Sequence, residues 1–165
     1  MSTRYHFFWN GPLSQWQNCQ LDMDGTLYTS AEQAMMHAKA ILFENAEIAD
    51  EILRASDPGK QKALGRQVAE FDQDRWSSAR YDIVVGINLA KFSQNKGLRR
   101  KLFQTGQLQL VEASPMDTVW GIGLDAETAR NTPEHLWPGQ NLLGRALMDV
   151  RTKLHALFPD ETTDE

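Results

Sequence analysis

The residues best suited to chemistry lie on one predicted helix near the N-terminus. The segment SAEQAMMHAKAILF places Glu32 and Lys39 seven positions apart. At about 100° per residue, both side chains project from a helix within about 20° of each other. Gln33, His37 and Glu44 form a separate polar arc, and the apolar arc around the pair consists of Ala34, Met35, Met36, Ala38, Ile41, Leu42 and Phe43. An acid and an amine therefore share the face that should stay apolar for packing.

This placement favours a chemical role for the pair. Burying such charges costs free energy, and even a paired burial rarely stabilises a fold more than apolar packing does. Charges in such places therefore serve chemistry more often than folding. Two structural alternatives stay open. Glu32 forms a capping box with Thr29, although Ser30 and Gln33 offer the same arrangement one residue later. Lys39 can extend over its apolar neighbours to reach solvent.

A second candidate site is the segment EASPMDTVWGIGL, residues 112–124. Asp117 and Trp120 lie three positions apart, and Gly121 and Gly123 follow the indole. A Trp ring can stack on a base or a ribose, and the amides of a Gly-x-Gly sequence can bind phosphate. A core Trp in a glycine-rich turn explains the same pattern equally well. The segment is not a dinucleotide fingerprint, because it has no third glycine at the required offset.

Weaker candidates for ligand binding lie elsewhere in the chain. The turn Trp9-Asn10-Gly11 repeats the combination of an indole and a glycine and adds an amide. Arg66 and Lys91 are cations suited to phosphate groups. Lys91 opens the basic run KFSQNKGLRRK, for which a solvated helix end is a simpler interpretation than phosphate binding.

The elements that must position these residues are mostly helical. Aromatic or alternating segments predict strands at residues 5–9 and 107–113, and Asp24-Gly25 predicts the tip of a hairpin. Periodic or capped segments predict helices at residues 29–45, 47–55, 60–71, 77–94 and 141–158. Residues 116–124 are expected to form a second strand or a loop, and residues 125–139 a long loop. The predicted fold class is a helix-rich α+β domain with a few short strands.

Composition excludes several classes of protein. The 165 residues suit one domain, expected over residues 1–158 with an acidic C-terminal tail at 159–165. A net charge of −5 argues against a dedicated nucleic-acid-binding protein. We see no apolar run long enough to span a bilayer, no secretory signal and no zinc-ligand spacing, and Cys19 is the one cysteine. We therefore expect a cytoplasmic protein that needs no metal, cofactor or membrane.

The same segments resemble the ordered motifs of the NADAR family, also called YbiA-like proteins. The resemblance rests on FWNGPLSQW, TSAEQAMMHAKAILF, KALGRQV, KFSQN, LVEASPMDTVWGIGL and NLLGRALMDVR, which span nearly the whole chain in order. It implies a helix-rich α+β domain with N-glycosidase chemistry. Some family members hydrolyse ribosylamino-pyrimidine phosphates of the riboflavin pathway, and others remove ADP-ribose from guanine in nucleic acid. The expected substrate is thus a small phosphoribosyl or ADP-ribosyl molecule, or ADP-ribosylated nucleic acid.

The resemblance also implies roles for individual residues. The family's helical Glu and the Lys seven residues later match Glu32 and Lys39, and its SPxDxxWG motif matches Asp117 and Trp120. Glu32 would then transfer protons, and Lys39 would contact the sugar as a covalent nucleophile or as a cation. Asp117 would contact the ribose or its developing positive charge, and Trp120 would stack on the base. Ala34 departs from the bulky residue that relatives often carry. A non-catalytic sensor of ADP-ribose or a related nucleotide is the alternative function.

Overall fold

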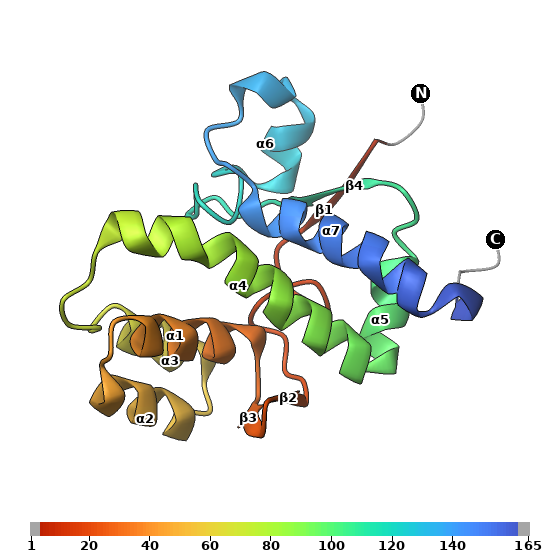
Figure 1. The fold of residues 1–165 in the computed structure, drawn as a ribbon. Coiled ribbons are helices and arrows are strands. Elements are labelled where there is room, and N and C mark those ends of the chain that lie inside the picture. Colours follow the sequence, from red (N-terminus) through yellow and green to blue (C-terminus); the bar gives the residue numbers. More distant parts are fainter. Residues whose placement is uncertain (1–3, 162–165) are drawn as a thin grey trace. The chain divides into compact units, whose positions relative to one another are not determined.

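The structure, a computed structural model, describes residues 4–161. The chain divides into two compact units: a central unit of residues 15–95, and a terminal unit of residues 1–14 and 96–165. Helices predominate and the strands are short, as the sequence predicts (Figure 1).

The central unit is built around one helix. It opens with a hairpin in which β2 (Leu21–Met23) pairs antiparallel with β3 (Thr26–Tyr28). Asp24 and Gly25 form the predicted tip, with φ angles of 55° and 90°. Four helices follow: α1 (Ala31–Leu42), α2 (Ala46–Arg54), α3 (Pro58–Gly65) and α4 (Gln73–Gln94). Helix α1 packs against the other three (Figure 1), so the helix carrying Glu32 and Lys39 has neighbours on several sides.

Capping side chains set the helix boundaries in this unit. The side chains of Ser30, Asn45, Asp57 and Asp72 each accept a hydrogen bond from a backbone amide in the first turn of α1, α2, α3 and α4. The prediction of a helix over residues 60–71 is wrong at both ends. Asp57 starts α3 early, and the helix ends at Gly65, where an added Cβ would lie 2.0 Å from the sulfur of Met36.

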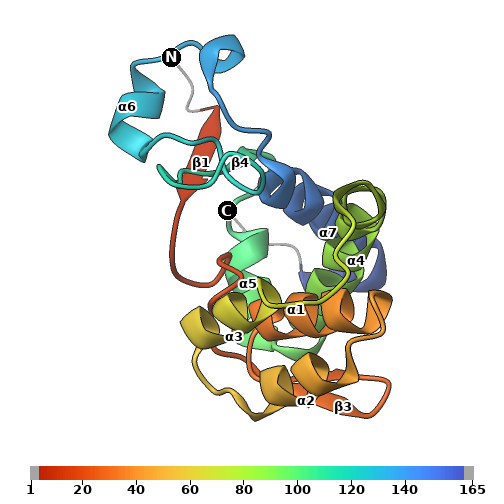
Figure 2. The same cartoon turned by 90° about the vertical axis from the view of Figure 1, so that its left-hand side faces the viewer.

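The terminal unit holds a two-stranded parallel sheet. Strand β1 (Tyr5–Phe8) pairs with β4 (Gln109–Glu112), Tyr5 lying opposite Gln109, and both strands fall within the predicted ranges. The unit also contains α5 (Lys96–Phe103), α6 (Ala126–Arg130), the 3₁₀ helices η1 (Glu134–Leu136) and η2 (Pro159–Glu161), and α7 (Leu142–Leu157). Figure 2 shows β1 and β4 side by side, next to α7.

Helix α7 lies within the helix predicted at residues 141–158, and it approaches the sheet closely with one apolar stripe. Its fully buried residues are Leu143, Ala146, Leu147, Val150 and Leu154. A Cβ on Gly144 would lie 2.2 Å from the carbonyl oxygen of Leu110, so only glycine permits this approach. Asn141, in a left-handed conformation with φ 55°, donates its side-chain amide to Leu110 O and accepts the amide of Glu112. These contacts fix the start of α7 to β4.

One further prediction is corrected in the terminal unit, and an alternative that the sequence left open is decided. Residues 125–139 are not one loop, because Asp125 caps the five-residue helix α6 through the amide of Thr128, and η1 follows. Residues 116–124 take the loop alternative and form no strand. In the expected acidic tail, Glu161 pairs with Arg99 at 2.6 Å, and residues 162–165 lie outside the described residues. The single domain over residues 1–158 stays a prediction.

The basic run from residue 91 to residue 101 is not one solvated helix end. Helix α4 ends at Gln94 and α5 begins at Lys96, so the run is shared between two helices. The solvated interpretation is wrong for Lys91 and Arg99, which are both buried. Arg99 stacks over the ring of Phe158, with the guanidinium carbon 3.9 Å from the ring centroid.

Candidate functional site

The hydrogen bonds at the start of α1 show which residues cap the helix, a role that the sequence left open for Glu32. The Ser30 hydroxyl accepts the amide of Gln33 at 3.0 Å. The side-chain oxygen of Gln33 accepts the amide of Thr29 at 2.7 Å. Glu32 donates its own backbone amide to the carbonyl of Gln15. Ser30 and Gln33 therefore cap the helix.

The polar and apolar arcs of α1 differ from the prediction at two positions. Gln33 belongs to the predicted polar arc, yet it is buried, and its amide donates to the carbonyls of Ile52 and Ala55 at 3.0 and 3.1 Å. Ile41 belongs to the predicted apolar arc and is exposed. Three helices pack around α1, so its exposed side does not follow one polar stripe.

Glu32 and Lys39 act on each other within the central unit. Glu32 is buried, with 4% of its surface exposed, and Lys39 is half-buried. Burial lowers the pKa of Lys39, the negative charge of Glu32 raises it, and the positive charge of Arg66 lowers it further. The net direction is downward from the ordinary value of 10.5. The structure thus brings together three residues that the sequence predicts for the site.

Two aromatic rings that were not predicted as site residues, those of Phe71 and Trp76, lie next to the Lys39 ammonium. The Nζ atom of Lys39 lies 4.6 Å from the ring centroid of Phe71 and 5.9 Å from that of Trp76. Phe71 meets Phe43 edge to face at 5.3 Å. These rings come from the end of α1, the loop before α4 and the first turn of α4. Their only sequence signal was two aromatic residues on either side of the Asp72 cap.

Lys91 is placed differently from Lys39. It is fully buried, and its Nζ atom lies 4.8 Å from the ring centroid of Phe92. Burial lowers the pKa of Lys91 to about 8, while nearby Cys19 raises it. Its side chain is therefore enclosed, whereas the side chain of Arg66, at the end of α3, is exposed.

In the terminal unit, the 114–124 loop uses its polar groups to hold its own backbone. One carboxylate oxygen of Asp117 accepts the amides of Val119 and Trp120, both at 2.9 Å. The carbonyls of the loop accept the amides at the start of α7: those of Thr118, Val119, Trp120, Gly121 and Ile122 accept from Gln140, Leu142, Leu143, Asn141 and Gly139, respectively. The loop therefore satisfies the unpaired amides of a helix N-terminus.

The indole and the glycine of the loop are also engaged in packing. Trp120 is partly buried. Gly121 is buried, and an added Cβ would lie 2.9 Å from the carbonyl oxygen of Glu112, so a close backbone contact requires this glycine. The neighbouring amide of Ile122 donates to the same carbonyl.

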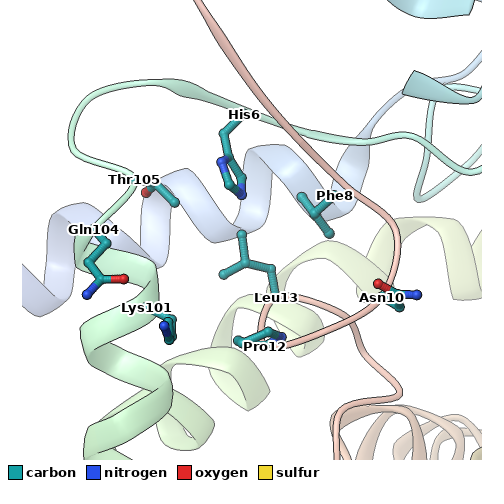
Figure 3. A pocket seen from close by; sticks show the side chains of 8 residues that line it. All are labelled: His6, Phe8, Asn10, Pro12, Leu13, Lys101, Gln104 and Thr105. Atoms are coloured by element: carbon teal, nitrogen blue, oxygen red, sulfur yellow. The ribbon is translucent and has the colours of Figure 1, made fainter. Parts of the chain in front are cut away.

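The turn after β1 borders a cavity of about 220 Å³ in the terminal unit (Figure 3). Trp9 and Asn10 are exposed, and Gly11 has a φ of 83°. Figure 3 shows residues from β1 and its turn on one side of the cavity and residues from the end of α5 on the other: His6, Phe8, Asn10, Pro12, Leu13, Lys101, Gln104 and Thr105. Asn10 is the one predicted site residue among them.

The described part of the chain adds two general observations. Within residues 4–161, no group of three His, Cys, Asp or Glu side chains has the arrangement of a metal site. No helix in this range combines the length and the apolar character that crossing a bilayer requires.

Comparison with known proteins agrees with the motif pattern. The NADAR domain family model matches residues 7–155. An N-glycosidase, R617, of Acanthamoeba polyphaga mimivirus is 48% identical over 124 residues, covering 75% of this chain and 73% of its own length. The riboflavin biosynthesis protein VVA0006 of Vibrio vulnificus is 30% identical over 150 residues, covering 91% of this chain and 37% of its own length.

A solved structure extends the comparison to the fold. The NMR structure of the Escherichia coli protein YbiA has a TM-score of 0.77 and 26% sequence identity, and the match covers 100% of this chain and 92% of that one. It supports the helix-rich α+β fold class. With a family model that spans most of the sequence, the chain belongs to the NADAR domain family.

Proposed function

We propose that this NADAR chain is an N-glycosidase that hydrolyses the C–N bond between a base and a phosphorylated ribose or an ADP-ribose. The observation that carries the proposal is the Glu32–Lys39 pair: a buried acid beside a half-buried amine of lowered pKa, with the Arg66 cation nearby. Ser30 and Gln33 make the capping hydrogen bonds at the start of α1, so the cap does not depend on a Thr29–Glu32 box.

The chemistry of N-glycoside cleavage suits these groups. As the C–N bond breaks, positive charge develops on C1 and the ring oxygen, and a nearby carboxylate stabilises it. Glu32 is the residue that transfers protons to the leaving base or from the attacking water. Arg66 is the exposed cation suited to a phosphate group of the substrate.

Lys39 contacts the sugar, by one of two routes that an experiment separates. As a cation, it holds oxygens of the sugar phosphate. As a nucleophile, its neutral amine forms a bond to C1 while the C–N bond to the base breaks and the base takes up a proton. The ring C1–O bond then opens, the nitrogen loses its proton to the ring oxygen, and an imine links Lys39 to the sugar. Water adds to C1, and the amine leaves.

The remaining predicted residues are assigned ligand contacts on the family motif. Asp117 contacts the ribose or its developing positive charge, Trp120 stacks on the base, and Gly121 contacts a phosphate. Trp9, Asn10 and Gly11 are assigned further substrate contacts. Lys91 lies fully buried, so a phosphate contact by Lys91 requires the phosphate itself to be enclosed.

The preferred substrate class is a small phosphoribosyl molecule. The name of the Vibrio vulnificus relative supports a riboflavin-pathway compound, and the net charge of −5 favours a metabolite over a nucleic acid. ADP-ribosylated guanine, free or in nucleic acid, is the other candidate substrate.

Direct incubation tests the proposal. The purified chain is mixed with a ribosylamino-pyrimidine phosphate or with ADP-ribosylated guanosine, and products are separated by chromatography. An N-glycosidase releases free base and sugar phosphate or ADP-ribose. A non-catalytic sensor raises its melting temperature with the same ligands and releases nothing, which would overturn the proposal.

Trapping with cyanoborohydride separates the two routes for Lys39. The nucleophilic route gives a sugar adduct on the peptide containing Lys39, and the adduct is absent from Lys39→Ala. Turnover without any adduct favours the cationic role.

A further inference from the structure

The loop between α3 and α4 carries an aromatic residue with no assigned role. This loop, residues 66–72, is fixed near both ends: Val68 is buried, and Asp72 caps α4. Glu70 has a φ of 55°, which turns the backbone just before Phe71. Phe71 is 40% exposed, whereas nearby Trp76 is 6% exposed. Phe71 is therefore the more solvent-accessible of the two rings next to Lys39.

Phe71 takes part in a short stack of side chains. Lys39 and Phe43 are four residues apart at the end of α1, on the same face of the helix. The Phe71 ring meets Phe43 edge to face, with an interplanar angle of 63°. The Lys39 Nζ atom lies nearer to the ring centroid of Phe71 than to that of Trp76, at 4.6 against 5.9 Å. Phe43 thus supports the ring that contacts the ammonium.

Charged groups from each packed element act on this stack. Glu32 faces Lys39 from α1, and Arg66 acts on it from the end of α3. From α4, the guanidinium carbon of Arg75 lies 5.7 Å from the ring centroid of Phe43. An aromatic face attracts an ammonium but has no such interaction with the neutral amine. The Phe71 ring therefore favours the protonated form of Lys39, as Glu32 does, whereas burial and Arg66 oppose it.

We propose that Phe71 is a positioning residue for Lys39: its ring holds the protonated side chain in place and opposes its deprotonation. This inference rests on the proposed N-glycosidase function. It adds a residue that acts on the same site and that none of the six sequence motifs quoted above contains. When Lys39 loses its proton to solvent or to Glu32, the attraction to the ring is lost and the amine is free to move toward C1.

Trace acetylation measures the protonation of Lys39 without any substrate. Acetic anhydride modifies only neutral amines, so the labelling rate at a series of pH values reports both the pKa and the accessibility of each lysine. Peptide mass spectrometry compares Lys39 with the exposed Lys60 of the same chain as an internal reference. The variants are Phe71→Leu, which keeps an apolar side chain without a ring, and Phe71→Tyr, which keeps the ring.

Phe71→Leu should label Lys39 about threefold faster than the wild type near neutral pH, because the lost ring contact lowers the pKa of the amine. Phe71→Tyr should label at the wild-type rate. Unchanged labelling in Phe71→Leu, or an equal change in both variants, would overturn the proposal. Leu27→Ala removes a 73% exposed side chain from β3 of the same unit and should leave Lys39 labelling unchanged.

Enzyme assays distinguish failure of this inference from failure of the proposed function. If the wild type hydrolyses its substrate, the part of the pH profile of kcat/KM that reports Lys39 should move to lower pH in Phe71→Leu and stay in place in Phe71→Tyr. Hydrolysis with identical labelling in all variants overturns the role of Phe71 alone. The expected labelling difference without any hydrolysis overturns the N-glycosidase proposal and supports the contact between Phe71 and Lys39.

Discussion

Helix α1 and the 114–124 loop both carry residue types of an active site, but their local structure uses those residues differently. In the loop, one oxygen of Asp117 accepts two backbone amides of its own turn. In α1, Ser30 and Gln33 provide the cap. Glu32 instead acts on the charge of Lys39, whose Nζ atom lies 4.6 Å from the ring centroid of Phe71.

A hydrogen bond to the local backbone changes how a candidate site residue is interpreted. A polar side chain that satisfies its own backbone has a structural reason to be present, and chemistry is then an additional claim. A buried acid that acts on a half-buried amine of lowered pKa is an arrangement found more often at functional sites. The N-glycosidase proposal therefore depends more on α1 than on the loop.

Removal of the amine should have the largest effect. Lys39→Ala is expected to lower kcat/KM by about a thousandfold or more, because it removes a group that contacts the reacting sugar. The melting temperature should change little, since the lost ammonium was partly desolvated. Product release measured by chromatography checks the first result, and thermal unfolding the second. Lys60→Ala, on exposed surface of α3, is the control. Near-normal activity in Lys39→Ala would exclude a central role for Lys39.

Neighbouring substitutions in the first turn separate chemistry from folding. Glu32→Gln should lower kcat by about a hundredfold or more with little loss of stability, because Ser30 and Gln33 provide the cap and Gln keeps the size of the side chain. Gln33→Ala should cost about 2–4 kcal/mol of unfolding free energy, because buried carbonyls of Ile52 and Ala55 lose their donor. Chemical denaturation and activity per folded molecule are compared for both. If Glu32→Gln unfolds as readily as Gln33→Ala, Glu32 serves the fold.

Much of the fold follows from local signals that a sequence contains. The Asp24-Gly25 tip and the α7 stripe were predictable because turn chemistry and periodicity act over a few residues. The end of α3 was not, since it depends on the fit of Gly65 against Met36. The five-residue helix α6 is too short to show a period. Local patterns do not report which distant elements pack together.

In the candidate site, too, features set by local sequence were predictable and features set by tertiary packing were not. The pairing of Glu32 with Lys39 follows from helix geometry, so spacing predicts it. The burial of Gln33 depends on α2, and a helical wheel does not show which neighbours surround each face. Arg66 and Phe71 reach Lys39 from a loop that the sequence pattern assigned to a helix over residues 60–71. The residue pattern and the motif resemblance both predict Asp117 and Trp120 as site residues, but neither reveals that the Asp117 side chain holds the turn.

Lys91, the fully buried lysine of the central unit, also has a lowered pKa, and its effect on stability can be measured. The pKa of Lys91 is about 8 in the folded chain, against an ordinary value of 10.5 when unfolded. Between these values the unfolded chain binds more protons, so the free energy of unfolding rises with pH. Deprotonation of Lys91 therefore adds about 3 kcal/mol to the free energy of unfolding. This gain is absent below pH 8 and complete above the unfolded pKa of 10.5.

Denaturation at several alkaline pH values measures this contribution. Because the Cys19 thiol, whose pKa is raised, opposes the trend, Lys91 and Lys91→Met are compared in a Cys19→Ser background. The difference in unfolding free energy between the two proteins should shift in favour of the lysine form as pH rises above 8. A difference that does not vary with pH would contradict the lowered pKa.

The smallest expected effect on stability concerns the loop. Asp117→Asn keeps an oxygen that accepts the amides of Val119 and Trp120, so its unfolding free energy should stay within about 0.5 kcal/mol of the wild type. Asp117→Ala removes that acceptor and should cost about 1–2 kcal/mol. Activity then decides the comparison with α1. If Asp117→Asn is as inactive as Glu32→Gln, the charge of Asp117 acts in the reaction while its oxygen holds the turn. If Asp117→Asn stays active and Asp117→Ala does not, the loop contributes shape, and the charge required for catalysis belongs to α1.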